Sequence, residues 1–334
     1  MRMNRVPPEL RGVDWRPAAM SHHPRRTASL LLTPVLAIVL GACTTGAAAS
    51  SPPSGSAAGA PGSSQPAASD TPGSPAGSLG PNAIDHKTGA TDVLLRYEDG
   101  GGHMILGYVA TAVPHFTLYG DGTVIFRNPM AEAPPAEGSI FKMNPLRTAK
   151  LNEAQIQELL LLALGEGGLA VARPNYTNDM IADASTAIFT IEAAGIKKTV
   201  SVYALGLEME GIADGPARAA FKRLADRLTD FDQGGTIPTD VYEPQAYRGV
   251  LFEAPGIEAA DVRGWPWPAI EPGDFTPDAD PNANQFPHRL MTIEEVDALG
   301  IEDYQGGLQN LVLKSSDGKT WTFSLRPLLP GEPG

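Results

Sequence analysis

The chain has 334 residues and a formal net charge of −13, with 38 acidic against 25 basic side chains. This acidic balance argues against nucleic acid or anionic headgroups as partners, because both need clustered Lys and Arg side chains. The single cysteine excludes an internal disulfide, so the folded part must owe its stability to an ordinary hydrophobic core.

The first predicted element is the uncharged apolar run Leu30 to Cys43, which follows Arg25 and Arg26. It is shorter than the roughly 20 residues that a membrane-spanning helix needs, and it contains Pro34. Both features are typical of a cleaved export signal, with a short uncleaved anchor as the alternative. Translation from Met20 would give the signal an ordinary basic start, so we predict that Met20 is the true start. General secretory and twin-arginine export both stay open.

The run closes on Leu40-Gly41-Ala42-Cys43 and resembles the signal peptide and lipobox of bacterial lipoproteins. The resemblance implies that residues 1–42 are removed by cleavage between Ala42 and Cys43. It also implies diacylglycerol on the Cys43 thiol and acylation of the new N-terminus. The protein is then expected on the extracytoplasmic face of the bacterial cell membrane, anchored through its N-terminal lipid.

Residues 43–83 follow as a predicted tether. From residue 44 the segment consists mainly of Ala, Gly, Ser, Pro and Thr, and Asp70 is its only charge. Such a composition buries too little apolar area to offset chain entropy, which predicts disorder. A flexible coil of this length has an r.m.s. reach of about 35 Å.

A first folded domain is predicted over residues 88–233, beginning with a strand near 93–97. Two hairpins follow: 116–119 with 123–126 around a Gly-Asp-Gly turn, and 187–191 with 199–203 around Ala194-Gly195. A helix over 152–164 is predicted by Asn152 and Gln155, which match a capping box. A second helix begins near Asp214 with Pro216 in its first turn.

The order hairpin, helix, hairpin, helix predicts an α+β fold, with an antiparallel sheet built from hairpins and two packed helices. The run Phe116–Phe126, with the helix and hairpin that follow, resembles a family of exported bacterial domains of unknown function. The resemblance covers roughly residues 90–232. It implies the fold and no catalytic residues.

A smaller α+β region is predicted over residues 234–330, after a linker at Gly234-Gly235. It contains a strand near 247–252, a proline-rich irregular stretch over 255–287, and a short helix over 292–299 opened by a capping box. A hairpin pairing 311–313 with 320–325 comes last. Whether the two regions share one core stays open.

The search for catalytic motifs finds no strong match. No histidine lies in a zinc-binding spacing. Ser316 and Lys319 match the S-x-x-K pattern of penicillin-recognising enzymes, but they lie between two predicted strands, where the sequence is typical of a turn. Glu208 and Glu210 could form a carboxylate pair, and solvated surface acids explain them equally.

Oxygen-bearing side chains alternate at Asp278, Asp280, Asn282 and Asn284, as they do in calcium loops. Calcium is therefore the one cofactor considered. The sixth position is Ala283 instead of Gly and the twelfth lacks Glu, so this is not an EF-hand, and an ordinary polar loop is favoured.

Trp265 and Trp267 alternate with prolines. Stiff backbone could hold both indoles outward as a binding surface for sugars or a partner. Burial between layers is the favoured interpretation, because tryptophan is highly buried on average.

These observations favour a lipid-anchored envelope protein with a non-enzymatic binding or adaptor role, for a protein or cell-wall partner. Two alternatives are a cell-wall-active hydrolase, whose acids meet only in the fold, and a solute-binding lipoprotein. The order of elements disfavours the second, since such proteins usually have two lobes of parallel α/β sheet.

Overall fold

The computed structural model describes residues 83–102, 106–128, 131–207, 211–256, 262–280 and 285–333. They belong to one compact unit, Ser74–Gly334. The expected export signal, the lipobox with Ala42 and Cys43, and the tether up to residue 82 lie outside the described residues. Within the described ranges, no helix has the length and apolar character needed to cross a membrane.

The α+β class expected from the sequence is confirmed, and the first of two sheets has eight strands in the order β6-β8-β7-β1-β2-β3-β5-β9. Its pairs are antiparallel except β6 with β8. The strands are β1 Val93–Gly100, β2 Phe116–Tyr119, β3 Thr123–Phe126, β5 Arg147–Lys150, β6 Asn175–Tyr176, β7 Thr186–Ala193, β8 Ile196–Tyr203 and β9 Asp240–Val241.

The second sheet has six strands, with β11-β13-β14-β10-β12 in order and β4 paired to β13. Only β11 with β13 is parallel. The strands are β4 Phe141–Lys142, β10 Tyr247–Glu253, β11 Arg263–Gly264, β12 His288–Met291, β13 Leu308–Lys314 and β14 Thr320–Pro327. The helices of both halves are α1 Leu106–Ala110, α2 Glu153–Leu164, α3 Gly215–Thr229, the 3₁₀ turn η1 Pro272–Asp274 and α4 Ile293–Asp297.

Local signals in the sequence account for the hairpins and for α2. Gly122 adopts φ +84°, a conformation that glycine allows without strain, in the turn between β2 and β3. The Asn152 side chain accepts from the Gln155 backbone N–H, and the Gln155 side chain accepts in return from the Asn152 N–H. The expected capping box therefore opens α2.

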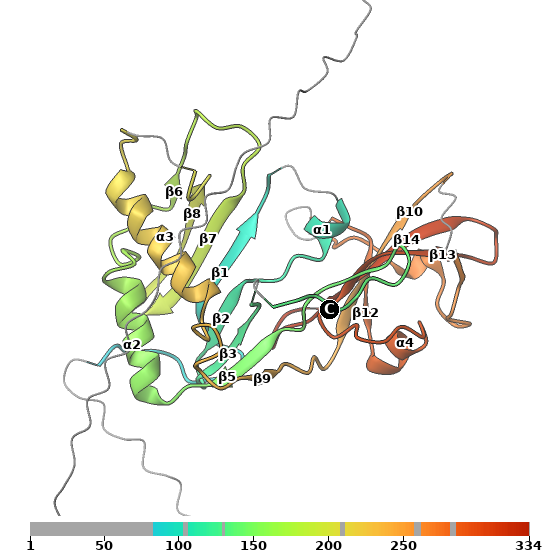
Figure 1. Ribbon diagram of the computed structural model, residues 1–334, viewed down its shortest axis with the longest axis horizontal. Helices are drawn as coiled ribbons and strands as arrows, with labels where there is room; N and C mark the ends of the chain where they lie inside the picture. Colours follow the sequence, from blue (N-terminus) through green and yellow to red (C-terminus); the bar gives the residue numbers. More distant parts are fainter. Residues whose placement is uncertain are drawn as a thin grey trace, which may run out of the picture. The chain divides into compact units, whose positions relative to one another are not determined.

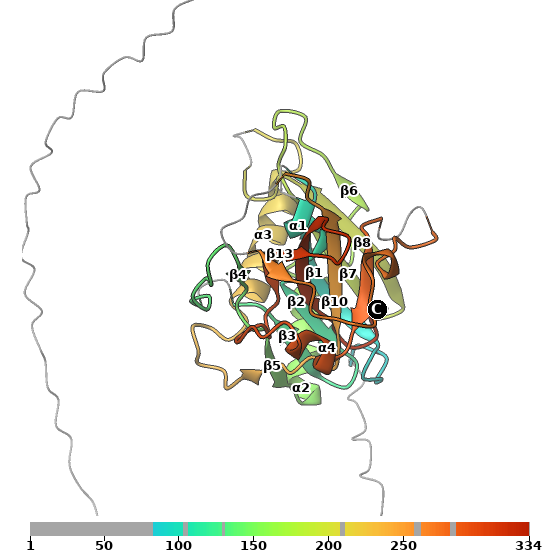
Figure 2. The ribbon, with the colours of Figure 1, turned by 90° about the vertical axis from the view of Figure 1, so that its right-hand side faces the viewer.

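The elements stack in layers, with α2 and α3 on one face of the first sheet and the second sheet on the other side (Figure 1). In the view turned by 90°, β10 and β13 lie in front of β1, β2 and β7 (Figure 2). One core lies under α2 and α3 and includes Leu95, Phe189 and Phe221; a second lies on the outer face of the second sheet and includes Trp267 and Phe323. A small third cluster contains Tyr119, Ile125, Leu146 and Leu329.

Short strands cross the expected boundary between residues 233 and 234. From the first region, β4 pairs with β13 of the second sheet. From the second region, β9 pairs with β5 of the first sheet. Each sheet is therefore completed by residues from the other half of the chain.

Candidate functional site

Side chains that alternate along β1 divide between two faces of the first sheet. Leu95 and Tyr97 belong to the core under α2 and α3. Successive side chains of a strand point to opposite faces, so Arg96 points toward the second sheet. On β14 of the second sheet, Phe323 and Leu325 belong to the outer core, and Arg326 therefore points back toward the first sheet.

Two arginines of the second sheet lie side by side. Arg248 of β10 and Arg326 of β14 are cross-strand partners in the antiparallel register, so their side chains share one face. Like charges directly opposite each other destabilise a sheet. This pair therefore needs an anion close by.

Glu332 supplies part of that negative charge. Its carboxylate accepts from both terminal nitrogens of Arg326, with Nη1–Oε2 at 2.8 Å and Nη2–Oε1 at 3.0 Å. The Leu329 backbone N–H also donates to Oε2, at 3.0 Å. Arg326 is fixed from its other side, because its Nε donates to the carbonyl oxygen of Ala112 at 2.6 Å. The result is a bidentate pair whose two side chains are only 7% and 12% exposed.

Arg96 and Arg248 complete a cluster around Glu332. Arg96 Nη1 lies 4.0 Å from Glu332 Oε1, and Arg248 Nη2 donates to the Pro333 carbonyl oxygen at 2.7 Å. A cavity of about 330 Å³ is lined by these groups together with Thr91, Val93 and residues 330–333. We call it the three-arginine pocket, after Arg96, Arg248 and Arg326.

Two donors in this pocket remain unsatisfied. The Nε atoms of Arg96 and Arg248 are buried and have no hydrogen-bond partner among the described residues. A buried donor without a partner costs the full desolvation of that group, about 1–3 kcal/mol. The Tyr119 hydroxyl, which is also buried, lies close enough to Arg96 to form a side-chain hydrogen bond with it.

The pKa shifts show how charge is balanced here. Burial alone would raise the pKa of Glu332, but the hydrogen bonds and charge of Arg326 outweigh it and hold that pKa below its usual range. Burial lowers the pKa of Arg248, and the charge of Arg326 adds to the effect. Burial raises the pKa of the nearby Glu98 despite the charge of Arg96. The three guanidinium groups of the pocket therefore lie close to the carboxylates of Glu332, Glu98 and Asp278, which act on their charge.

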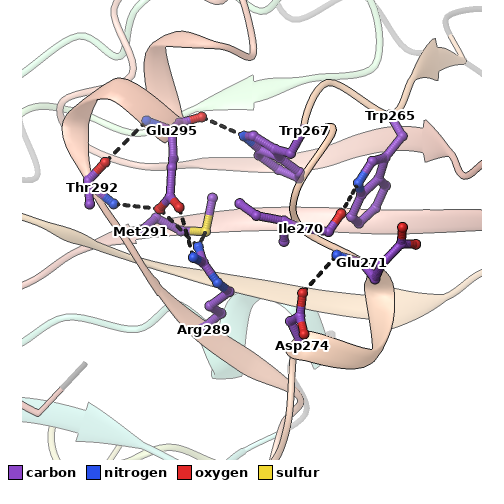
Figure 3. A network of polar contacts seen from close by, with 9 residues as sticks. All are labelled: Trp265, Trp267, Ile270, Glu271, Asp274, Arg289, Met291, Thr292 and Glu295. Atoms are coloured by element: carbon purple, nitrogen blue, oxygen red, sulfur yellow. Dashed lines mark hydrogen bonds and ion pairs between the residues drawn. The ribbon is translucent and has the colours of Figure 1, made fainter.

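The two tryptophans, for which burial was the favoured interpretation and an exposed binding surface the alternative, both pack against the core of the second sheet. Trp267 is 4% exposed and packs in the core of the second sheet, where its Nε1 donates to the Glu295 carbonyl oxygen at 2.7 Å (Figure 3). Trp265 is partly buried, and its Nε1 donates to the Ile270 carbonyl oxygen at 2.6 Å (Figure 3). Trp267 is buried, as the burial interpretation expected, and its hydrogen bond joins the proline-rich segment to α4, whereas the hydrogen bond of the partly buried Trp265 stays within that segment.

An ion pair stabilises the helix beside these indoles. Glu295 pairs with Arg289 through two hydrogen bonds of 2.9 and 2.8 Å, and it also closes the expected capping box with Thr292 (Figure 3). The hydrogen bonds from Arg289 hold the pKa of Glu295 below its usual range. This cluster has its polar groups satisfied by one another, which favours a structural role.

The proposed calcium loop is described only in part. Asp278 Oδ1 lies 3.5 Å from Nε2 of His288, whose side chain is 6% exposed. Asp280 is among the described residues, but Asn282 and Asn284 are not, so the arrangement of the four proposed ligands cannot be compared. Within the described ranges, no group of three or more His, Cys, Asp or Glu side chains is arranged to hold a metal ion.

The remaining sequence candidates separate into two groups. The Ser316–Lys319 segment forms the turn between β13 and β14, where Asp317 Oδ1 accepts from the Ser315 hydroxyl at 2.5 Å and from the Lys319 N–H at 3.1 Å. It is a hairpin turn, as its flanking strands predicted. Glu208 and Glu210 lie outside the described residues.

A larger groove, of about 600 Å³, lies along α2 and the end of α3. Its walls include Leu159, Leu162 and the 65% exposed Leu161. Its one arginine, Arg227, donates to the carbonyl oxygens of Asp230 and Phe231. Its other polar lining residues include Glu158 and Glu166, so the groove differs from the three-arginine pocket in having more acidic than basic groups.

Comparison with known proteins adds no relative, since no protein-family model, curated protein or solved structure matches the chain. The site is therefore defined by its geometry. Sequence reasoning missed Arg96, Arg248 and Arg326. Only Arg248 stands within an otherwise apolar run, because β1 also carries Glu98 and Asp99 and β14 also carries Thr and Ser side chains.

Proposed function

We propose that this protein is a lipid-anchored envelope protein with a non-enzymatic binding role, and that its ligand presents an oxyanion to the three-arginine pocket. The observation that carries the proposal is the convergence of the Arg96, Arg248 and Arg326 side chains on one cavity around the carboxylate of Glu332. Guanidinium groups match carboxylates and phosphates with paired, charge-assisted hydrogen bonds.

Glu332 supports this choice of ligand, because its own carboxylate is held as a bound anion would be. It neutralises one of the three arginines and leaves donors of the other two unsatisfied. The cavity of about 330 Å³ fits a small anion or one anionic group of a wall component or protein. No bond-breaking step is needed for this role.

Titration calorimetry on the purified lipoprotein tests the proposal, with inorganic phosphate and citrate as probes at constant ionic strength. We expect binding of at least one probe with a Kd of about 1 mM or tighter, which corresponds to about −4 kcal/mol. Arg248→Gln removes one charged donor and should weaken binding about tenfold. Glu332→Gln removes the competing carboxylate and should strengthen it.

Arg173→Gln is the matched control, since it removes the same charge from an exposed ion pair in which Arg173 is 60% exposed. It should leave binding unchanged. If neither phosphate nor citrate binds, or if both arginine variants weaken binding equally, the three-arginine pocket is not the anion site.

A further inference from the structure

The groove of about 600 Å³ along α2 borders a run of four successive leucines, residues 159–162. Each residue of a helix is turned by about 100° from the one before, so four of them spread over about 300° and cannot all face the core. Leu159 and Leu160 are buried, whereas Leu162 is half-buried and Leu161 is 65% exposed. The sequence of α2 therefore places leucines outward, in the lining of the groove. We call this hollow the α2 groove.

A second part of its lining comes from the end of α3 and the chain that follows. Figure 1 shows α2 and α3 on the same face of the first sheet. Phe231 is almost fully buried, and Ile237 is half-buried, so Ile237 adds apolar surface beside Leu161 and Leu162. A single exposed leucine is ordinary, but apolar side chains gathered in one hollow mark a place for an interaction partner.

The polar edge of the α2 groove is acidic. Glu158 lies one helical turn before Leu162, and Glu166 follows the end of α2. Both carboxylates are exposed, and neither is paired with another side chain in the described part of the protein. The C-terminal end of a helix carries a partial negative charge, and the last turn of α2 has no basic residue to offset it. The negative charge at this edge is therefore not neutralised by the fold itself.

The arginine in the lining, Arg227, is used within its own segment. It lies in the last turn of α3, where its Nη1 donates to the Phe231 carbonyl oxygen at 3.0 Å and to the Asp230 carbonyl oxygen at 3.4 Å. Its guanidinium carbon is 5.5 Å from the centre of the Phe231 ring. Arg227 thus offsets the negative end of α3. The acids of α2 are left for a cation from another molecule.

We propose that the α2 groove binds a basic amphipathic helix of a partner protein. The apolar face of that helix packs against Leu161, Leu162 and Ile237, and its Lys or Arg side chains lie at Glu158 and Glu166. A helix satisfies its own backbone hydrogen bonds, whereas an extended peptide needs a strand edge, and no lining residue belongs to a strand.

The extent of the groove sets the length of helix that it contacts. From Gln155 to Leu162 its lining follows α2 for seven residues, which is about 10 Å or two turns of a helix. An anionic membrane surface is disfavoured here, because the acidic edge repels it. The α2 groove shares no lining residue with the three-arginine pocket, so this inference does not rest on the proposed anion binding.

Fluorescence anisotropy on the purified lipoprotein tests the inference with a labelled peptide of about 14 residues, or four helical turns, made of leucine and lysine with the leucines on one face. One control peptide has glutamate in place of lysine, and another has the same composition with the leucines scattered around the helix. We expect a Kd of about 100 μM or tighter for the first peptide and binding at least tenfold weaker for both controls. A protein-free blank corrects for peptide bound to detergent.

Leu161→Gln locates the apolar contact. It removes a side chain that only a bound partner would bury, so it should weaken the lysine peptide at least tenfold. The matched control is Leu290→Gln on β12, where the leucine is 50% exposed and lies outside the groove. It should leave binding unchanged. Thermal unfolding checks that both variants are folded.

A pair of acid variants locates the charged contact. Glu158→Gln combined with Glu166→Gln should weaken the lysine peptide about fivefold at low salt, and the effect should shrink as salt is raised. Glu132→Gln combined with Glu302→Gln removes the same charge from exposed positions outside the groove and should change nothing.

Three results would overturn the inference. The first is equal binding of the lysine and glutamate peptides, or no binding of the lysine peptide. The second is binding by Leu161→Gln that is as tight as binding by Leu290→Gln. The third is equal weakening by the two double acid variants, because the peptide would then follow the overall negative charge of the protein and not the α2 groove.

Discussion

At the scale of single residues, Glu332 balances the buried charge of Arg326. It compensates a guanidinium that is itself 7% exposed. Removing one partner of a buried pair leaves the other charge uncompensated, which typically costs 3–5 kcal/mol. The amide of Glu332→Gln keeps one acceptor, so we expect a loss of about 2–3 kcal/mol in the free energy of unfolding at pH 7.

The pH dependence of this loss follows from the direction of the pKa shift. The pKa of Glu332 is lowered in the folded state, so its contribution is fully present above the unfolded value of about 4.3 and is lost as pH falls through the folded pKa. Urea unfolding should show the difference between wild type and Glu332→Gln shrinking below about pH 4. A difference that is constant from pH 7 to pH 3 would contradict the assignment.

Asp226→Asn provides the control for a charge pair in water. Asp226 pairs with Lys222 on the surface of α3, and the two side chains are 61% and 46% exposed. An exposed pair of this kind contributes about 0.5 kcal/mol or less. If Glu332→Gln and Asp226→Asn lower the free energy of unfolding equally, the Glu332–Arg326 pair contributes no more than an exposed surface pair.

At the scale of elements, the N-terminus of α2 carries its own stabilising contacts. Asn152 accepts from the backbone of Gln155 at 3.0 Å, and the helix then buries Ile156, Leu160 and Ala163. Replacing an N-cap asparagine by alanine costs about 1 kcal/mol. Urea unfolding of Asn152→Ala should show that loss, with the slope against urea unchanged.

Glu158→Ala is the matched control on the same helix. Glu158 is exposed and lies in the helix interior, where alanine is favourable, so its change should stay within about 0.5 kcal/mol. If Asn152→Ala is as neutral as Glu158→Ala, the capping box contributes nothing to stability.

The sequence could predict the elements that neighbouring residues specify, and it could not predict those that depend on a distant strand. The β2–β3 hairpin and α2 are specified by neighbours such as Gly122 and Asn152, and both were predicted with accurate bounds. By contrast, β4, β9 and β11 are two residues long and exist because a distant strand pairs with them. No local pattern marks such strands. The three-arginine pocket is missed for the same reason, since Arg96, Arg248, Arg326 and Glu332 meet only through the pairing of distant strands.

At the scale of the whole molecule, the lipid anchor is the testable part of the proposed function. Labelling cells with a fatty-acid analogue should modify the wild-type protein, and Cys43→Ala should abolish both the label and recovery in the membrane fraction. Two or more acyl chains are enough for stable anchoring, whereas one chain binds only weakly.

Crosslinking in the membrane extends this experiment to partners, with Cys43→Ala as the mislocalised control. Its fold should be intact, because Cys43 precedes the described residues, and thermal unfolding checks this. If the Cys43→Ala protein stays labelled and membrane-bound, the proposed lipid anchor at Cys43 is contradicted. The alternative, in which the apolar N-terminal run stays uncleaved in the membrane, would then be favoured.

The position of β14 has a consequence for biosynthesis. It is the last strand described, yet it lies in the middle of its sheet, between β13 and β10. A chain that emerges from its N-terminus must therefore keep the edges of β10 and β13 unpaired until residues 320–327 have appeared. Exposed strand edges attract other chains. The second sheet can therefore be completed only after β14 has appeared, and a holding chaperone would matter most to this protein before that point.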